Sequence, residues 1–89
     1  MTVLSRAAKE ALNEEFGRKL FLARRRAGMS QGALAESSGI HFATISLFET
    51  AKRTPRLDTI CRLAVGLGIR PGELIDGVGV ERGGEPSGG

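Results

Sequence analysis

Apolar residues recur along most of this chain at the three- and four-residue spacing of amphipathic helices, and no segment alternates with the two-residue period of a strand. The first strong run starts at Asn13, a residue type that caps helices, and stops at Gly28. Its apolar face consists of Phe16, Leu20, Ala23 and Ala27. The spacing therefore predicts a first helix between Asn13 and Gly28.

Two short helices are predicted next, with a tight turn between them. Ser30 is placed to cap the second helix, and Ser38 and Gly39 are placed to stop it. The third helix is predicted from about Phe42 to Glu49, after Ile40 in the turn. The residues expected to face inward are Leu34 and Ala35 in the second helix and Ile45 and Phe48 in the third.

A polar loop from Ala51 to Pro55 precedes a fourth amphipathic helix that ends at Gly68. The apolar positions of this fourth helix are Leu57, Ile60, Cys61, Leu63, Ala64 and Leu67. Pro71 suits the first turn of a short fifth helix that ends near Leu74 and Ile75. The pattern thus predicts an all-α domain of five helices at 13–76. It is preceded by an arm or helix extension at 1–12 and followed by a disordered, glycine-rich tail at 77–89.

Composition narrows the class of protein. With 89 residues there is room for one domain, and the formal net charge of +3 is compatible with a polyanionic partner. No apolar run is long enough for a signal sequence or a membrane span, so we expect a cytoplasmic protein without a membrane partner. Neither a glycine-rich phosphate loop nor a pair of catalytic carboxylates is visible, so we expect no enzyme and no cofactor.

The single histidine and the single cysteine do not suggest chemistry. One His41 and one Cys61 cannot supply the ligands of a metal site, and no third group supports a nucleophile. Cys61 falls on the apolar stripe of the fourth helix, where a buried thiol is an ordinary core residue. We interpret His41 as a cap or turn residue near phosphate.

Four linked segments carry a family resemblance: FGRKLFLARRRAGMSQGALAESSGI, HFATISLFE, KRTP and LDTICRLAVGLGI. Together they resemble the phage-repressor and Cro-like helix-turn-helix family of bacterial and phage regulators, over about Phe16 to Ile75. The resemblance implies a compact, lambda-repressor-like, five-helix DNA-binding domain. It also implies a homodimer whose third helices enter the major groove of double-stranded DNA. The two candidate dimer surfaces are the N-terminal arm and the fifth helix with Leu74, Ile75 and the following Val78.

The resemblance also assigns site residues. Those implied to face the bases are Phe42, Ala43, Ser46 and Leu47. Those implied to lie near phosphate are Ser30, Gln31, His41, Thr44, Thr50, Lys52, Arg53 and Arg56. Arg24 and Glu49 match positions where the family joins the first helix to the third by an ion pair. No metal ligand is implied.

Three departures from the family pattern change these expectations. No Lys or Arg occurs between Met29 and Ala51, so bidentate reading of guanine is excluded on the third helix, and we predict an A/T-containing half-site. Thr50-Ala51 replaces the usual Asn-Gly, which suits left-handed backbone, so the loop is open to a different conformation. Phe21 and Leu22 lie on a side of the first helix that relatives leave polar, so we expect the N-terminal arm or a second subunit to cover them.

Two classes of function remain open at this point. The first is a transcriptional regulator, most simply a repressor, that binds a palindromic operator as a dimer without a small-molecule effector or an attached effector-binding domain. Within it, a phage or plasmid repressor, a restriction–modification controller and an autoregulating antitoxin all fit. The alternative is a protein–protein interaction module that uses the apolar third helix.

Overall fold

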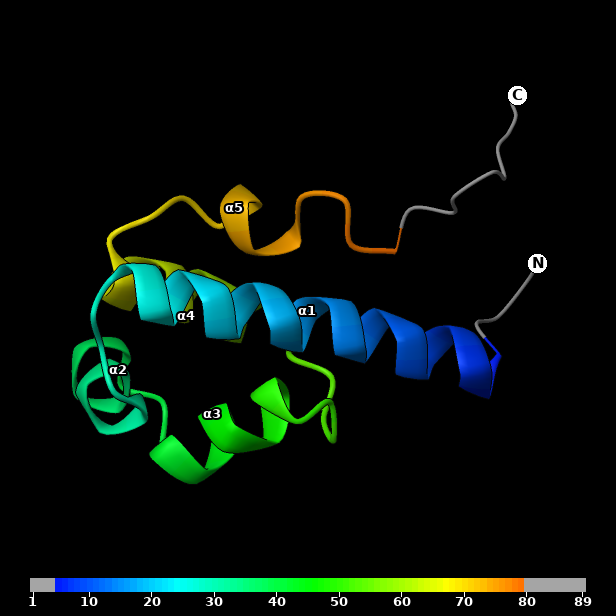
Figure 1. Ribbon diagram of the computed structural model, residues 1–89, viewed down its shortest axis with the longest axis horizontal. Helices are drawn as coiled ribbons and strands as arrows, with labels where there is room; N and C mark the ends of the chain where they lie inside the picture. Colours follow the sequence, from blue (N-terminus) through cyan, green and yellow to red (C-terminus); the bar gives the residue numbers. More distant parts are fainter. Residues whose placement is uncertain (1–4, 80–89) are drawn as a thin grey trace.

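The computed structural model describes residues 5–79, and within them the chain forms five helices and no strand (Figure 1). The helices are α1 (Arg6–Arg26), α2 (Gln31–Ser38), α3 (Phe42–Glu49), α4 (Leu57–Leu67) and α5 (Gly72–Ile75). The all-α fold of five helices is therefore confirmed. The outer parts of the expected arm and tail, residues 1–4 and 80–89, lie outside the described residues.

The first helix starts earlier than the sequence pattern indicated. Ser5 caps α1, because its hydroxyl oxygen accepts a hydrogen bond of 3.1 Å from the backbone N–H of Ala8. The prediction that Asn13 caps this helix is wrong. Residues before Asn13 have good helix propensity and continue the same helix, so Asn13 lies inside it and is buried.

The helix-turn-helix follows the predicted local signals closely. The Ser30 hydroxyl oxygen accepts from the N–H of Ala33 at 3.0 Å and caps α2, while Gly39 ends α2 in the left-handed conformation. His41 caps α3 through Nδ1, which accepts from the N–H of Ala43 at 3.2 Å. Both short helices therefore begin at a side-chain cap that lies next to them in the sequence.

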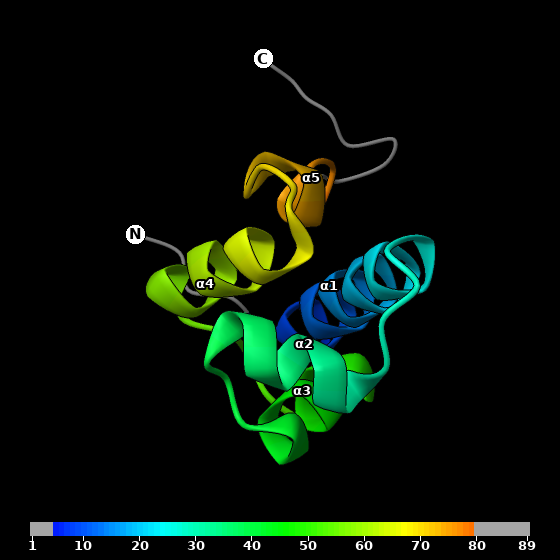
Figure 2. The ribbon, with the colours of Figure 1, turned by 90° about the vertical axis from the view of Figure 1, so that its left-hand side faces the viewer.

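One hydrophobic core contains residues of all five helices. Figure 2 shows the helices arranged around a common centre. The rings of Phe16 on α1 and Phe48 on α3 meet edge to face, with centroids 5.9 Å apart. Gly17 and Gly66 allow α1 to approach α3, and α4 to approach α2, at backbone distance. The buried apolar residues are Phe16, Leu20, Leu34, Ile40, Ile45, Phe48, Leu63, Ala64, Leu67 and Leu74.

The predicted apolar face of α4 is wider than the face that is buried. Leu63, Ala64 and Leu67 are in the core, but Leu57 is 74% exposed and Cys61 is an exposed free cysteine. The predictions that Leu57 and Cys61 face inward are therefore wrong. The physical reason is that α2 and α5 cover one side of α4, while Leu57 and Cys61 lie beyond the edge of that side.

None of the helices within residues 5–79 combines the length and the apolar character that crossing a membrane requires.

Candidate nucleic-acid interface

Helix α3 has a buried face and an outward face, as its sequence period dictates. Ile45 and Phe48 are buried against the core. On the opposite side, Phe42 is 55% exposed and Ala43 is exposed, while Ser46 and Leu47 are half-buried. The four residues that the sequence assigned to the bases therefore share one accessible surface.

The beginning of α3 is stiffened by two neighbouring rings. The imidazole of His41 stacks on the ring of Phe42, with centroids 5.1 Å apart and planes inclined by 26°. Because His41 Nδ1 accepts from the N–H of Ala43, the Nε2 side of the ring is directed away from the helix cap. Phe42 therefore projects from the start of α3 with one face of its ring against His41.

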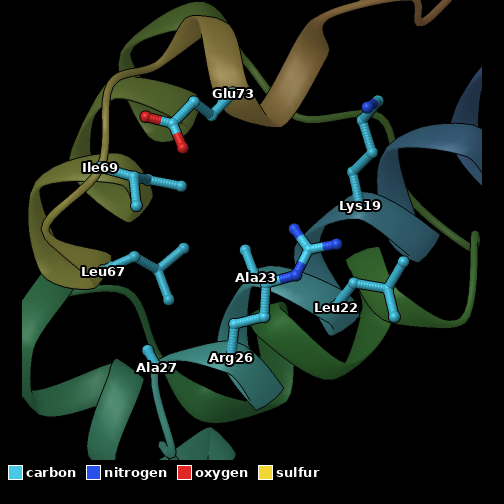
Figure 3. Close-up of a pocket in the computed structure, with 8 residues that line it drawn as sticks. All are labelled: Lys19, Leu22, Ala23, Arg26, Ala27, Leu67, Ile69 and Glu73. Atoms are coloured by element: carbon cyan, nitrogen blue, oxygen red, sulfur yellow. The ribbon is translucent and has the colours of Figure 1, made fainter.

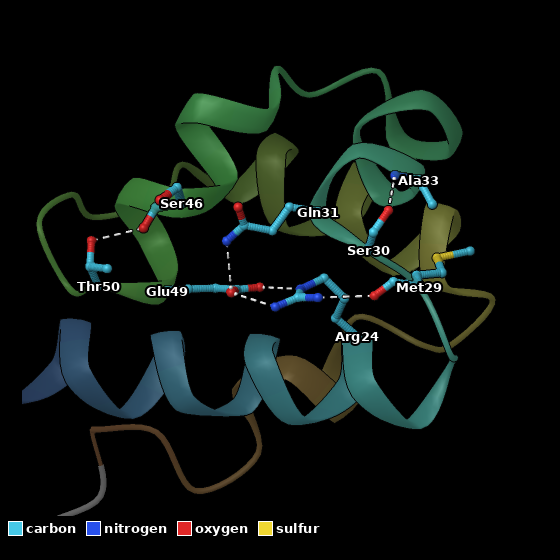
Figure 4. A network of polar contacts seen from close by, with 8 residues as sticks. All are labelled: Arg24, Met29, Ser30, Gln31, Ala33, Ser46, Glu49 and Thr50. Carbon is cyan, nitrogen blue, oxygen red and sulfur yellow. Dashed lines mark hydrogen bonds and ion pairs between the residues drawn. The ribbon is translucent and has the colours of Figure 1, made fainter.

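The opposite end of α3 is held by a buried ion pair (Figure 4). Arg24 on α1 donates to both carboxylate oxygens of Glu49, from Nε at 2.7 Å and from Nη2 at 2.9 Å. A further guanidinium hydrogen bond of 2.9 Å reaches the carbonyl oxygen of Met29. Hydrogen bonding to Glu49 raises the pKa of Arg24 above its ordinary value, despite the opposing effect of burial.

Gln31, the first residue of α2, joins the same network. Its Nε2 donates to Oε1 of Glu49 at 3.1 Å, so one carboxylate links α1, α2 and α3 (Figure 4). The sequence assigned Gln31 to phosphate. The structure places its amide beside Glu49, half-buried, with one N–H already donated to the carboxylate.

The loop after α3 contains a left-handed turn, although Thr50-Ala51 stands where the family usually has Asn-Gly. Ala51 has φ of 63°, and the N–H of Lys52 donates to the carbonyl oxygen of Leu47 at 2.8 Å. The Thr50 hydroxyl donates to the carbonyl oxygen of Ser46 at 2.8 Å, so its hydrogen is already used within the helix end. The chain thus adopts this geometry with alanine in a conformation that favours glycine.

Three basic residues follow that turn. Lys52 and Arg53 are exposed, and Arg56 is exposed as well. Arg56 lies 3.6 Å from Asp58, but both side chains are well solvated, so this pair contributes little to stability. These three residues follow the C-terminal end of α3, whereas Ser30 precedes α2.

Two anchoring contacts were not anticipated from the sequence. The Thr54 hydroxyl donates to Oδ1 of the buried Asn13 at 2.8 Å and ties the basic loop to α1. The hydrogen bond from Gln31 to Glu49 was also missed. The signal for the first contact was an asparagine at helical spacing from Phe16 and Leu20, since a polar residue on a buried face needs a partner.

Phe21 and Leu22 are each 39% exposed. The described part of the N-terminal arm, residues 5–12, belongs to the same straight helix and is too far along its axis to fold over them. The expectation that this part of the arm covers them is therefore wrong. The guanidinium groups of Arg24 and Arg25 instead lie 5.4 Å and 5.5 Å from the centroid of the Phe21 ring.

A pocket of about 240 Å³ lies apart from this surface, between α1 and the segment that joins α4 to α5 (Figure 3). Lys19 and Arg26 stand on the α1 side of it and Glu73 on the α5 side, around a mainly apolar floor. Residues 5–79 contain no cluster of three or more side chains suited to hold a metal ion. The outward face of α3, with its flanking polar groups, is therefore the candidate site.

Comparisons with known proteins match this geometry. A family model described as a helix-turn-helix domain matches residues 15–77. An HTH_3 family transcriptional regulator from Vibrio cholerae superposes with a TM-score of 0.74 at 20% identity, over 80% of this chain and 40% of that chain. The restriction-modification controller protein C.AhdI from Aeromonas hydrophila superposes with a TM-score of 0.68 at 35% identity, over 70% of this chain and 94% of that chain. Curated protein sequences give no significant match.

Proposed function

This chain belongs to the helix-turn-helix domain family, and we propose that it is a sequence-specific transcriptional regulator that binds DNA as a homodimer through α3. The observation that carries the proposal is the outward face of α3, where Phe42 and Ala43 are exposed while Ile45 and Phe48 hold the helix on the core. In this function the protein is a binding protein and not an enzyme. We propose that the regulator acts most simply as a repressor that binds a palindromic operator.

Phosphate binding is proposed for the groups on either side of α3. The N-terminus of α2 begins at Ser30 and Gln31, where free N–H groups and the helix dipole attract an anion. On the other side, Lys52, Arg53 and Arg56 present positive charge to the adjacent strand. His41, Thr44 and Thr50 complete the proposed phosphate contacts, with Thr50 contributing through its oxygen because its hydrogen is donated to Ser46.

Base reading by α3 is proposed to rest on apolar contact and hydroxyl groups. Phe42, Ala43 and Leu47 offer carbon atoms that pack on thymine methyl groups, and Ser46 offers a hydroxyl to a base edge. Since α2 and α3 contain no Lys or Arg, guanine is not the preferred base opposite this helix. We therefore expect half-sites that contain A/T pairs.

Within the regulators, a restriction–modification controller is the candidate that one comparison favours. The Aeromonas controller is covered over 94% of its length, whereas the Vibrio regulator is covered over only 40%. The helix-turn-helix domain of this chain thus matches nearly the whole of that controller, and this match is the observation behind the candidate.

A titration of fluorescent A/T-rich duplex by anisotropy at several salt concentrations tests the proposal. About six phosphate contacts per dimer predict a slope of log affinity against log salt near roughly −5. A protein–protein interaction module predicts no salt-sensitive affinity for duplex. Absence of binding at low ionic strength to A/T-rich duplex and to a pool selected from random oligonucleotides would contradict DNA binding.

A pair of variants separates the loss of a base contact from a general loss of folding or DNA binding. We expect Phe42→Ala to weaken binding to the selected sequence and to reduce the preference for it over random duplex by about tenfold. Ile75→Ala is the matched control, because Ile75 is a 40% exposed apolar residue on α5, at the other end of the molecule from α3 (Figure 1). An equal effect of the two variants would argue against Phe42 at the bases.

A further inference from the structure

Helix α4 carries an exposed apolar stripe that the DNA-binding function does not use. Leu57, Cys61 and Val65 are spaced by four residues and project from one side of the helix. Leu57 is 74% exposed, Val65 is 76% exposed and Cys61 is also exposed. These three residues, the α4 stripe, span most of an 11-residue helix whose opposite side is in the core.

We propose that the α4 stripe is the docking surface for a second copy of this chain, with the two α4 helices antiparallel about a twofold axis at Cys61. The stripe is symmetric about that residue, since Leu57 precedes it by four positions and Val65 follows it by four. Antiparallel pairing therefore brings Leu57 of each copy against Val65 of the other and the two Cys61 side chains together. An isologous dimer requires this self-complementary arrangement.

Charge complementarity supports the same orientation. Asp58 and Arg62 follow Leu57 and Cys61 directly, so both lie along one edge of the stripe. A twofold axis through Cys61 places Asp58 of one copy about 3 Å along the helix from Arg62 of the other, at a rise of 1.5 Å per residue. Two Asp58–Arg62 ion pairs then line one edge of the apolar contacts. In a parallel pair the twofold axis would run along the helices and put these two edges on opposite sides, so the ion pairs could not form.

The surface beside Val65 also has room for a side chain. A hollow of about 200 Å³ is lined by Ser37 and Ser38 from α2 and by Cys61, Arg62 and Val65 from α4. In the antiparallel pair, Asp58 of the second copy comes level with this edge, so the hollow leaves room for its carboxylate beside Arg62.

The pairing also directs both α3 helices to the same side. The edge with Arg62 is the edge that faces α2, because a Cβ atom on Gly39 at the end of α2 would lie 3.9 Å from Arg62 Nη2. The twofold axis maps this edge of one copy onto the same side of the other. Both α2–α3 units then lie on one side of the pair, as a palindromic site requires, and this last step alone rests on the proposed function.

The size of the stripe sets the strength of the dimer. Three exposed side chains per copy bury less than the roughly 1,200 Å² that a stable interface usually needs. We therefore expect weak association in solution, reinforced when two half-sites bring the copies together.

Thiol cross-linking of the full chain without DNA tests the interface. A short bismaleimide should convert wild type to a Cys61-linked dimer at least about tenfold faster than a Cys61→Ser/Arg18→Cys control, whose thiol lies on α1. Cross-linking of the two proteins at equal rates, at concentrations where sedimentation detects dimers, would overturn the α4 pairing. Sedimentation as a monomer up to about 1 mM would overturn it as well.

Variants provide a second, independent test. Val65→Glu should weaken self-association by about tenfold or more, because it buries charge at the contact, while Ile75→Glu should leave it unchanged. Arg62→Asp should weaken it, and adding Asp58→Arg should restore it. Unchanged association of Val65→Glu would overturn the proposal. Binding of Val65→Glu to a single half-site is measured in parallel, so a failure of DNA binding is distinguishable from a failure of pairing.

Discussion

Arg24 is the charged residue that the core of the described chain buries, and its environment supplies a partner for each of its donor groups. The resemblance to known regulators indicated the pair with Glu49, but it did not indicate Gln31 as a third member. The Glu49 carboxylate accepts hydrogen bonds from both Arg24 and Gln31, so it holds α1, α2 and α3 together. Removal of this carboxylate would leave buried donor groups of both residues without an acceptor.

We expect Glu49→Ala to lower the free energy of unfolding by about 3 to 5 kcal/mol, because Arg24 would keep its positive charge in a buried place without a counter-charge. Urea unfolding followed by circular dichroism measures the change. Glu36→Ala is the matched control, since Glu36 is an exposed glutamate on α2. A loss of less than about 1 kcal/mol would mean that the pair is not holding α3 to α1.

Ala51 offers a second prediction at the scale of one residue. Its φ of 63° is unfavourable for a side chain with a Cβ atom, so we expect Ala51→Gly to raise the free energy of unfolding by about 0.5 to 1 kcal/mol. Ala33→Gly in α2, where the backbone is helical, should lower it by about 1 kcal/mol. Thermal melts of both variants against wild type give the two signs. A destabilised Ala51→Gly would argue against the left-handed turn.

Contacts between elements depend on glycines as well as on large apolar residues. A Cβ atom on Gly17 would collide with the carbonyl oxygen of Phe48 and would lie 3.1 Å from that of Glu49. Both obstacles are backbone atoms, so a side chain cannot simply rotate away. Gly17 therefore sets the separation between α1 and α3, and with it the orientation of the outward face of α3.

We expect Gly17→Ala to lower the free energy of unfolding by at least about 2 kcal/mol, because α1 must move away from α3. Gly32→Ala is the control, since its nearest neighbour would be the Ser30 hydroxyl at 3.8 Å and α2 gains helix propensity. Chemical unfolding of the two variants should therefore give opposite signs. A neutral Gly17→Ala would indicate that the two helices are not in close contact.

Helix positions were largely predictable because their signals are local. Ser30, Gly39 and Gly68 act on their own backbone neighbours, and both ends of α2 and the C-terminal end of α4 follow from them. The start of α1 was not predictable from Asn13, since a capping residue type can equally be a buried polar residue. Its partner Thr54 is 41 positions away in the sequence.

At the scale of the whole molecule, positive charge is unevenly placed relative to α3. Lys52, Arg53 and Arg56 lie in or next to one loop, and the N-terminus of α2 lies on the other side of the same helix. A net charge of +3 alone indicates little, and most Lys and Arg residues of the described chain lie on α1, but these three charges place attraction for phosphate next to the end of α3.

We expect Lys52→Ala to weaken binding to all duplex sequences by a similar factor and to reduce the magnitude of the salt slope by about 1 per subunit contact removed. Sequence preference should stay unchanged, because phosphate contacts carry no base information. Anisotropy titrations with the selected and a scrambled duplex measure both quantities, and Lys9→Ala on the first turn of α1 is the control. A changed preference with an unchanged slope would contradict a phosphate contact.

The sequence by itself determined the presence of five helices, the caps of α2 and α3 and the inward residues Ile45 and Phe48, because periodicity and capping act over a few neighbouring positions. Tertiary structure alone decided which side of α4 is covered, so that Cys61 is exposed and Leu63 is buried. It also decided that Gln31 meets Glu49 and that Thr54 meets Asn13. The physical reason is that burial and long-range hydrogen bonds depend on which helices pack together, and no local pattern records that.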